Sequence, residues 1–184
     1  MDLQLLGGLI GILIHLPLLF SIWQGKTKQS FATYALWSIL DFIAAYAIYV
    51  QNGNFWLPFL YGIGAGIVSV SLLVKKCFSW GAVESFVLLL IVICLFVKYN
   101  SGEFYAMIVS VSSLAIASVP QVINTFKIPH ETPTKIYLVF CVANMISLLG
   151  AKSFALEEIL YAGSALIICI VITGLSVRRV WRLI

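Results

Sequence analysis

Seven long apolar runs, joined by short polar connections, dominate this 184-residue sequence. They cover approximately residues 3–23, 32–50, 56–74, 82–97, 104–126, 136–152 and 159–177. An α-helix needs about 20 apolar residues to cross a bilayer. The chain is 62% hydrophobic and only 10% charged, and its mean hydropathy is +1.08, whereas a soluble domain has about 25% charged residues. The sequence therefore excludes a soluble globular domain and predicts an integral, multi-pass membrane protein.

The spanning segments are expected to be helices. Every backbone polar group in a bilayer must be satisfied internally, which leaves α-helices and closed barrels. The runs do not alternate polar and apolar residues with the period of two that a barrel strand requires. Met1 and Asp2 precede the first run without a positive segment, so we expect this run to stay in the protein rather than be cleaved. The predicted fold class is an all-α membrane protein with seven transmembrane helices.

The basic residues indicate an orientation. Nine of the eleven lie in the first, third and fifth connections or in the C-terminal tail, and only Lys98 and Lys152 lie on the other side. The positive-inside rule then places the N-terminus outside and the C-terminus in the cytoplasm. We expect a bacterial inner membrane, because the loops and tail are short; an organelle membrane of the same topology is the alternative. Basic residues in ones and twos beside apolar runs fit a membrane rather than nucleic acid, and the four cysteines lack the spacing of a metal site.

The chain contains an internal repeat. Shifted by 103 positions, Pro17 falls on Pro120, Tyr34 on Tyr137 and Asp41 on Asn144, and Leu60-Tyr61-Gly62 resembles Leu160-Tyr161-Ala162-Gly163. We expect a 3+1+3 arrangement: a first three-helix bundle in residues 1–76, a connecting helix in 77–103 and a second three-helix bundle in 104–184. The connecting helix makes the two bundles parallel, so a substrate site is expected on the axis between them.

One segment carries a family resemblance. Pro120-Gln121 near the inner end of an apolar helix, a polar loop over 127–135 and a following helix with Asn144 resemble a PQ-loop repeat. This repeat is the unit of the SWEET sugar transporters, the half-size SemiSWEETs and cystinosin. The first half departs from the motif with Pro17-Leu18, but Leu40-Asp41-Phe42 is similar to the segment that the family associates with proton coupling. The resemblance implies a SWEET-like transporter fold.

Asp41 is the main candidate functional residue, because it is the only carboxylate in the middle of a predicted span. Placing a charged residue there costs roughly 2.5–3.5 kcal/mol on an insertion scale. It is either an uncharged hydrogen-bond donor between helices, or a carboxylate at a water-filled cavity that exchanges a proton or binds a cationic group. Its helix face and the equivalent face of the sixth run are expected to meet and bind a solute. The predicted binding residues are Asp41, Asn144, Trp37, Phe140, Tyr34, Tyr137 and Ser38.

The prolines predict hinges. Each removes a backbone donor and clashes with the preceding turn, so the helices are expected to bend at Pro17 and Pro120. Gln121 and Asn124 follow Pro120. Their amides either bridge the carbonyls that the proline releases or form part of a cytoplasmic gate. His15, two residues before Pro17, is either a structural hydrogen-bonding residue or a proton relay with Asp41.

The predicted function is secondary transport of a small polar solute, such as an amino acid, a sugar or a related metabolite, by alternating access with proton coupling through Asp41. The alternative is a non-transporting seven-helix receptor or adaptor with the same fold. An enzyme is disfavoured, because the sequence has no HExxH motif and no pair of intramembrane aspartates. We expect no cofactor, metal or nucleic acid; the expected partners are the solute, protons and membrane lipid. A monomer suffices because both halves lie in one chain, and an oligomer stays open.

Overall fold

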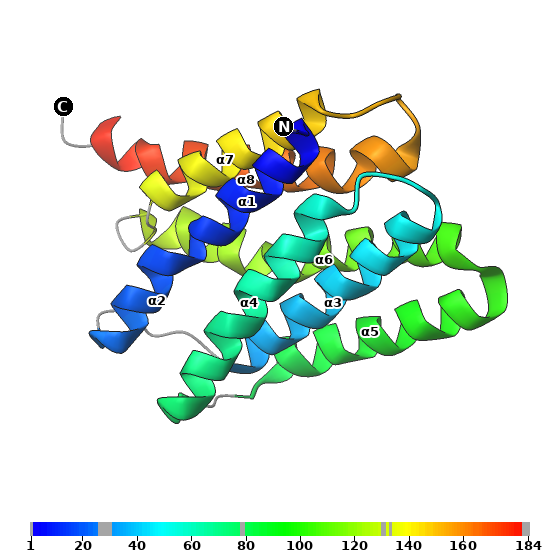
Figure 1. Cartoon of the computed structure of the whole chain (residues 1–184). Helices are drawn as coiled ribbons and strands as arrows, with labels where there is room; N and C mark the ends of the chain where they lie inside the picture. Colours follow the sequence, from blue (N-terminus) through cyan, green and yellow to red (C-terminus); the bar gives the residue numbers. More distant parts are fainter. Residues whose placement is uncertain (1, 26–30, 78–79, 130–131, 133, 182–184) are drawn as a thin grey trace.

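The chain is described by a computed structural model that covers residues 2–25, 31–77, 80–129, 132 and 134–181, without the side chains of residues 120, 124 and 179–181. Within these residues every regular element is helical (Figure 1). The helices are α1 (Leu3–Leu13), α2 (His15–Trp23), α3 (Phe31–Val50), α4 (Trp56–Val74), α5 (Ala82–Ser101), α6 (Glu103–Lys127), α7 (Thr134–Leu149) and α8 (Leu156–Trp181).

The expectation of an all-α membrane protein is confirmed. Six segments are long and apolar enough to cross a membrane, with α1 and α2 counted together as the span Leu3–Trp23. The seventh apolar helix, α7, has only 16 residues, about 24 Å at 1.5 Å per residue. The predicted sixth run therefore ends earlier than residue 152. Gly150 follows α7 closely packed against Gln4, where an added Cβ would lie 2.8 Å from the Gln4 backbone nitrogen.

The two proline-containing helices differ. The first span is interrupted at Ile14, which separates α1 from α2. Pro17 has no N–H to donate to the carbonyl of Leu13, so the helix is weakened in this turn. In contrast, α6 is continuous from Glu103 to Lys127 and passes Pro120 without an interruption. Hinge motion at either proline stays a prediction, and the side chains of Pro120 and Asn124 lie outside the described residues.

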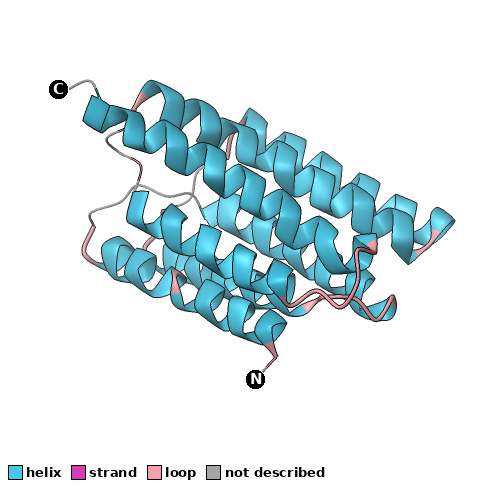
Figure 2. Ribbon diagram, turned by 90° about the horizontal axis from the view of Figure 1, so that it is seen from above, coloured by secondary structure: helices cyan, strands magenta, loops and turns pink. Residues whose placement is uncertain are grey.

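The packing order of the helices differs from their order in the sequence. Helix α4 lies between α1 and α3, and α8 lies between α6 and α7. These two groups contact each other where α1 packs on α7 and α3 packs on α6. Helix α5 packs on α6 and α3, at the edge away from α1 and α7 (Figure 1). The helices run side by side when viewed from above (Figure 2).

Small residues allow this close packing. The largest buried cluster joins α3, α4, α6 and α8, and its small members include Ala44, Ala47, Ala106 and Ala162. On α1, a Cβ added at Gly7 would lie 2.7 Å from the carbonyl oxygen of Ala143 in α7. Glycine is therefore required where these two helices cross.

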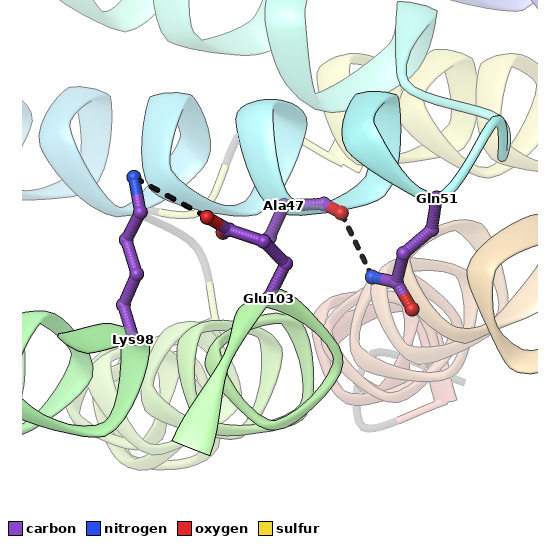
Figure 3. Close-up of polar contacts among 4 residues, drawn as sticks. All are labelled: Ala47, Gln51, Lys98 and Glu103. Carbon is purple, nitrogen blue, oxygen red and sulfur yellow. Dashed lines mark hydrogen bonds and ion pairs between the residues drawn. The ribbon is translucent and has the colours of Figure 1, made fainter. Parts of the chain in front are cut away.

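Charged residues gather at the two ends of the helices. At one end, which we call the Asp2 end, Lys98 Nζ lies 3.8 Å from Glu103 Oε1 and 3.9 Å from the centre of the Tyr46 ring. Figure 3 shows this ion pair beside the last turn of α3, where Gln51 Nε2 donates to the Ala47 carbonyl over 2.8 Å. Lys75, Lys127, Lys135 and Arg178 belong to the helix ends at the opposite side, which we call the Lys75 end. The basic residues that the sequence places on one side of the membrane are thus found together at the Lys75 end.

Candidate functional site

Asp41 lies near the middle of α3, and its side chain is only 5% exposed. The hydroxyl of Tyr161 in α8 donates a short hydrogen bond of 2.6 Å to Asp41 Oδ1. Tyr161 is also buried, at 7% exposure. This bond connects residues 120 positions apart in the sequence, and it links a helix of the first half of the chain to a helix of the second half.

Asn144 and Tyr61, which the predicted repeat matches to Asp41 and Tyr161, lie beside this pair. Asn144 in α7 is fully buried, and the hydroxyl of Tyr61 in α4 faces its side chain and interacts electrostatically with Asp41. Asn144 Nδ2 donates to the Phe140 carbonyl over 2.7 Å. In contrast, Asn144 Oδ1 and the Tyr61 hydroxyl are buried without a hydrogen bond to any described residue. We call Asp41, Tyr61, Asn144 and Tyr161 the central cluster.

Aromatic rings surround the central cluster. The ring centres of Tyr61 and Phe140 are 5.4 Å apart, and those of Tyr61 and Tyr161 are 6.2 Å apart, both in edge-to-face geometry. His15 is the first residue of α2, and the centre of its ring lies 6.3 Å from that of Tyr61 and 5.7 Å from that of Phe140. Its Nδ1 pairs with the carbonyl of Gly11 over 3.1 Å. The imidazole is thus held between the broken first span and the edge of the cluster.

The other predicted binding residues extend from this centre towards the Lys75 end. The Tyr137 hydroxyl interacts electrostatically with Tyr34, and each tyrosine packs on an aromatic neighbour: Tyr34 on Trp37 at 5.5 Å and Tyr137 on Phe140 at 6.2 Å. Trp37 also packs against the apolar cluster formed by α3, α5 and α6. Ser38 Oγ donates to the Gly62 carbonyl over 2.8 Å, which joins α3 to α4.

The predicted gate residues lie apart from the cluster, in the last turns of α6. Gln121 Nε2 donates to Thr125 Oγ1 over 3.3 Å, and Thr132 Oγ1 donates to the same oxygen over 3.0 Å. The first bond lies within α6, and the second connects α6 to the segment that precedes α7. A gating role for Gln121 stays a prediction.

A second group of buried polar residues joins the two halves at the Asp2 end. Gln4 Nε2 donates to Glu158 Oε2 over 2.7 Å and to the Gly150 carbonyl over 3.0 Å. Asn54 Nδ2 donates to the carbonyl and to Oγ of Ser147 over 3.2 and 3.0 Å. We call Gln4, Asn54, Ser147 and Glu158 the end seam. It holds the start of α1 and the α3–α4 connection against α7 and the α7–α8 connection.

The central cluster is closed in this conformation. The structure has a groove of about 410 Å³ between α3 and α4, lined by Phe42, Gly62, Gly66 and Val70 among others. A second pocket of about 220 Å³ lies at the Asp2 end. Neither of these two spaces is lined by a residue of the central cluster. The four cluster residues are themselves at most 9% exposed, so Asp41 has little contact with solvent in this conformation.

Tyr61 and Tyr161 are the site residues that sequence reasoning did not assign. The sequence does contain a feature that marks them, because both tyrosines stand at matching positions of the Leu60-Tyr61-Gly62 and Leu160-Tyr161-Ala162 segments. The repeat identified the positions without indicating that each tyrosine reaches a polar residue in the other half. Gln4 and Glu158 had no signal beyond their places near predicted span ends.

Comparison with known proteins adds no assignment: no family model, no curated protein and no solved structure matches the chain.

Proposed function

We propose that this chain is a secondary transporter that moves a small polar solute across a membrane by alternating access. The observation that carries the proposal is the central cluster. Its four polar side chains come from α3 and α4 in the first half of the chain and from α7 and α8 in the second half. All four are at least nine-tenths buried. Polar residues inside a membrane are costly, and they commonly mark a solute or ion pathway. A purely structural polar cluster would gain most from having all its members paired, which is not so here.

The helix contacts support a 3+1+3 architecture. The contacts of α1 with α4 and of α3 with α4 have counterparts in those of α6 with α8 and of α7 with α8. The contact of α1 with α7 has its counterpart in that of α6 with α3. The same set of these helix contacts results when the first span, α3 and α4 are exchanged for α6, α7 and α8. This exchange is the expected property of two parallel repeats about an axis, and α5 is then the connecting helix.

The repeat also relates the members of the cluster. Tyr161 reaches Asp41 across the two halves, and Tyr61 faces Asn144 in the reverse direction. The site thus lies between the bundles, where relative motion of the bundles opens and closes it. The end seam keeps the Asp2 end closed, so we propose that opening at this end requires its bonds to break. With the positive-inside rule, the Asp2 end faces outward and the Lys75 end faces the cytoplasm of a bacterial cell.

We assign proton coupling to Asp41. It is the only acidic member of the cluster, and its Oδ1 accepts the Tyr161 hydroxyl. When the site opens to water on one side, the carboxylate can take or release a proton there. A solute that competes with Tyr161 for the carboxylate then couples its own binding to the protonation state. The Pro17 turn, where α1 ends, is the proposed hinge on the first bundle.

The test is uptake by the purified chain in proteoliposomes. A panel of labelled amino acids, sugars and amines is offered with and without an imposed proton gradient. We expect saturable uptake of at least one solute, stimulated by the gradient, and loss of that stimulation in Asp41→Asn. Glu157→Gln is the matched control, because Glu157 lies at the start of α8 away from the cluster. Gradient-stimulated uptake at the full rate in Asp41→Asn removes the coupling role, and saturable binding without flux favours a receptor.

A further inference from the structure

The central cluster contains two buried polar atoms without partners, on the neighbouring side chains of Asn144 and Tyr61. Asn144 Oδ1 and the Tyr61 hydroxyl belong to residues that are 0% and 9% exposed, and neither makes a hydrogen bond to a described residue. Buried polar groups are nearly always paired, so each exception needs an explanation. Here the two side chains are neighbours at the proposed transport site. The explanation that we pursue is a ligand group that pairs with both in the loaded state.

The cluster offers more acceptors than donors. The ionised Asp41 carboxylate and Asn144 Oδ1 can only accept hydrogen bonds, and the two amide hydrogens of Asn144 are used by the Phe140 carbonyl over 2.7 Å and by Cys169 Sγ over 3.9 Å. The Tyr161 hydrogen is used by Asp41. Only the Tyr61 hydroxyl can still donate. A solute that pairs with these atoms must therefore bring donors of its own.

The charge balance points in the same direction. Asp41 is the only ionisable acid of the cluster, and the lysine and arginine side chains among the described residues belong to the helix ends and connections: Lys75, Lys76, Lys98, Lys127, Lys135, Lys152 and Arg178. An anionic group at the cluster would meet a carboxylate, and among the described residues the imidazole of His15 at the cluster edge is the one side chain nearby that could carry a positive charge. A cationic group would meet Asp41 and the rings of Tyr61, Phe140 and Tyr161, which attract cations through their faces.

We propose that the solute is a small organic cation with N–H donors, either a primary ammonium or a guanidinium. Its nitrogen binds to Asp41 and to Asn144 Oδ1, and the Tyr61 hydroxyl oxygen accepts a further hydrogen. This substrate class rests on the proposed transport function, and it narrows that function to one kind of polar solute.

The experiment compares three probes with the same four-carbon skeleton. Putrescine carries an ammonium at each end, butanediol carries a neutral hydroxyl and succinate carries a carboxylate. Binding to the purified full chain is measured by isothermal titration calorimetry, and flux is measured by uptake of labelled probe into proteoliposomes. We expect saturable binding and uptake of putrescine only. Binding or uptake of butanediol or succinate equal to that of putrescine overturns the substrate class.

Two variants test the unpartnered atoms. Tyr61→Phe and Asn144→Leu are each expected to weaken putrescine binding about tenfold, the loss of one hydrogen bond to a charged group. Tyr99→Phe and Asn100→Leu are the matched controls, because both residues are exposed on α5 and Asn100 Nδ2 also donates to a carbonyl four residues earlier. Circular dichroism and size-exclusion chromatography establish that each variant is folded. If Asn144→Leu does not fold, Tyr61→Phe alone decides, since it removes a hydroxyl that makes no hydrogen bond to a described residue.

The two proposals fail in different ways. If the chain transports a neutral or anionic solute and does not bind putrescine, the substrate class is wrong and transport stands. If putrescine binds with the expected sensitivity to Tyr61→Phe but is not carried, the substrate class stands and transport is wrong. If putrescine is neither bound nor carried, or if Tyr61→Phe binds it as tightly as the unmodified chain, the assignment of the unpartnered atoms is overturned.

Discussion

The end seam and the central cluster are both buried polar contacts between the two halves of the chain, but they differ in how completely they are bonded. In the end seam, Glu158 accepts from Gln4 and from the Lys152 backbone nitrogen, and Asn54 makes two bonds to Ser147. One seam acceptor, Asn54 Oδ1, is unpartnered. In the central cluster, a single side-chain bond crosses between the halves, from Tyr161 to Asp41.

This difference separates a stabilising contact from a binding site. Hydrogen bonds formed within the chain contribute to its stability, and they leave little for a ligand to gain. Buried polar groups left unpaired cost stability, but they can bind a ligand without first breaking an internal bond. We therefore expect substitutions in the end seam to change stability strongly, and substitutions in the central cluster to change solute binding more than stability.

The largest loss of stability is expected for Glu158→Leu. The change removes the acceptor of Gln4 Nε2 and of the Lys152 nitrogen. The free energy of unfolding should fall by about 3 kcal/mol, because bonds to a charged group are the stronger ones. Unfolding of the purified chain in detergent by heat or denaturant measures it. The matched control is Glu157→Gln, where only the backbone carbonyl is used by Asn54. An unchanged stability in Glu158→Leu would remove the seam as a stabilising contact.

A smaller effect is expected for Asn54→Ala. This change removes both bonds to Ser147 in α7, and the free energy of unfolding should fall by about 2 kcal/mol. It should also loosen the Asp2 end, so the backbone amides of the α3–α4 connection should exchange their hydrogens with water faster, which hydrogen–deuterium exchange measures. Equal exchange rates with and without Asn54→Ala would show that these bonds do not keep this end closed.

The sequence predicted the helices better than it predicted these contacts. Hydropathy placed every long helix, because each span must be apolar over most of its length. It missed the interruption at Ile14 as a helix boundary and extended α7 past Leu149, since local packing against Gln4 determines that end. Asp41 and Asn144 were found because polar residues inside apolar runs are conspicuous. Their tyrosine partners were not assigned, since an aromatic residue in a span is ordinarily read as packing and its hydroxyl contact depends on the tertiary structure.

Within the central cluster, Tyr161→Phe is expected to cost about 1 kcal/mol, which is less than either seam substitution. The change removes the one donor to Asp41 Oδ1. Hydrogen bonds between membrane helices contribute on average about 0.6 kcal/mol and at most about 1.7 kcal/mol, so a loss of about 1 kcal/mol lies within their range. Unfolding in detergent measures the loss. The release of Asp41 should also alter uptake under a proton gradient. A loss as large as that of Glu158→Leu would contradict the distinction between seam and cluster.

The smallest loss of stability is expected for Tyr61→Phe, where the free energy of unfolding should fall by less than about 0.5 kcal/mol or rise, because an unpaired buried hydroxyl is itself costly. The removed hydroxyl makes no hydrogen bond to a described residue, so no bond is lost and the ring keeps its edge contacts with Phe140 and Tyr161. Tyr61→Phe and Tyr161→Phe remove the same atom from matching positions of the repeat, and the difference between their unfolding free energies therefore isolates the one bond that distinguishes the two halves. Equal losses would mean that Tyr61 is bonded to Asn144 in the membrane, and the comparison between a paired and an unpaired half would fail.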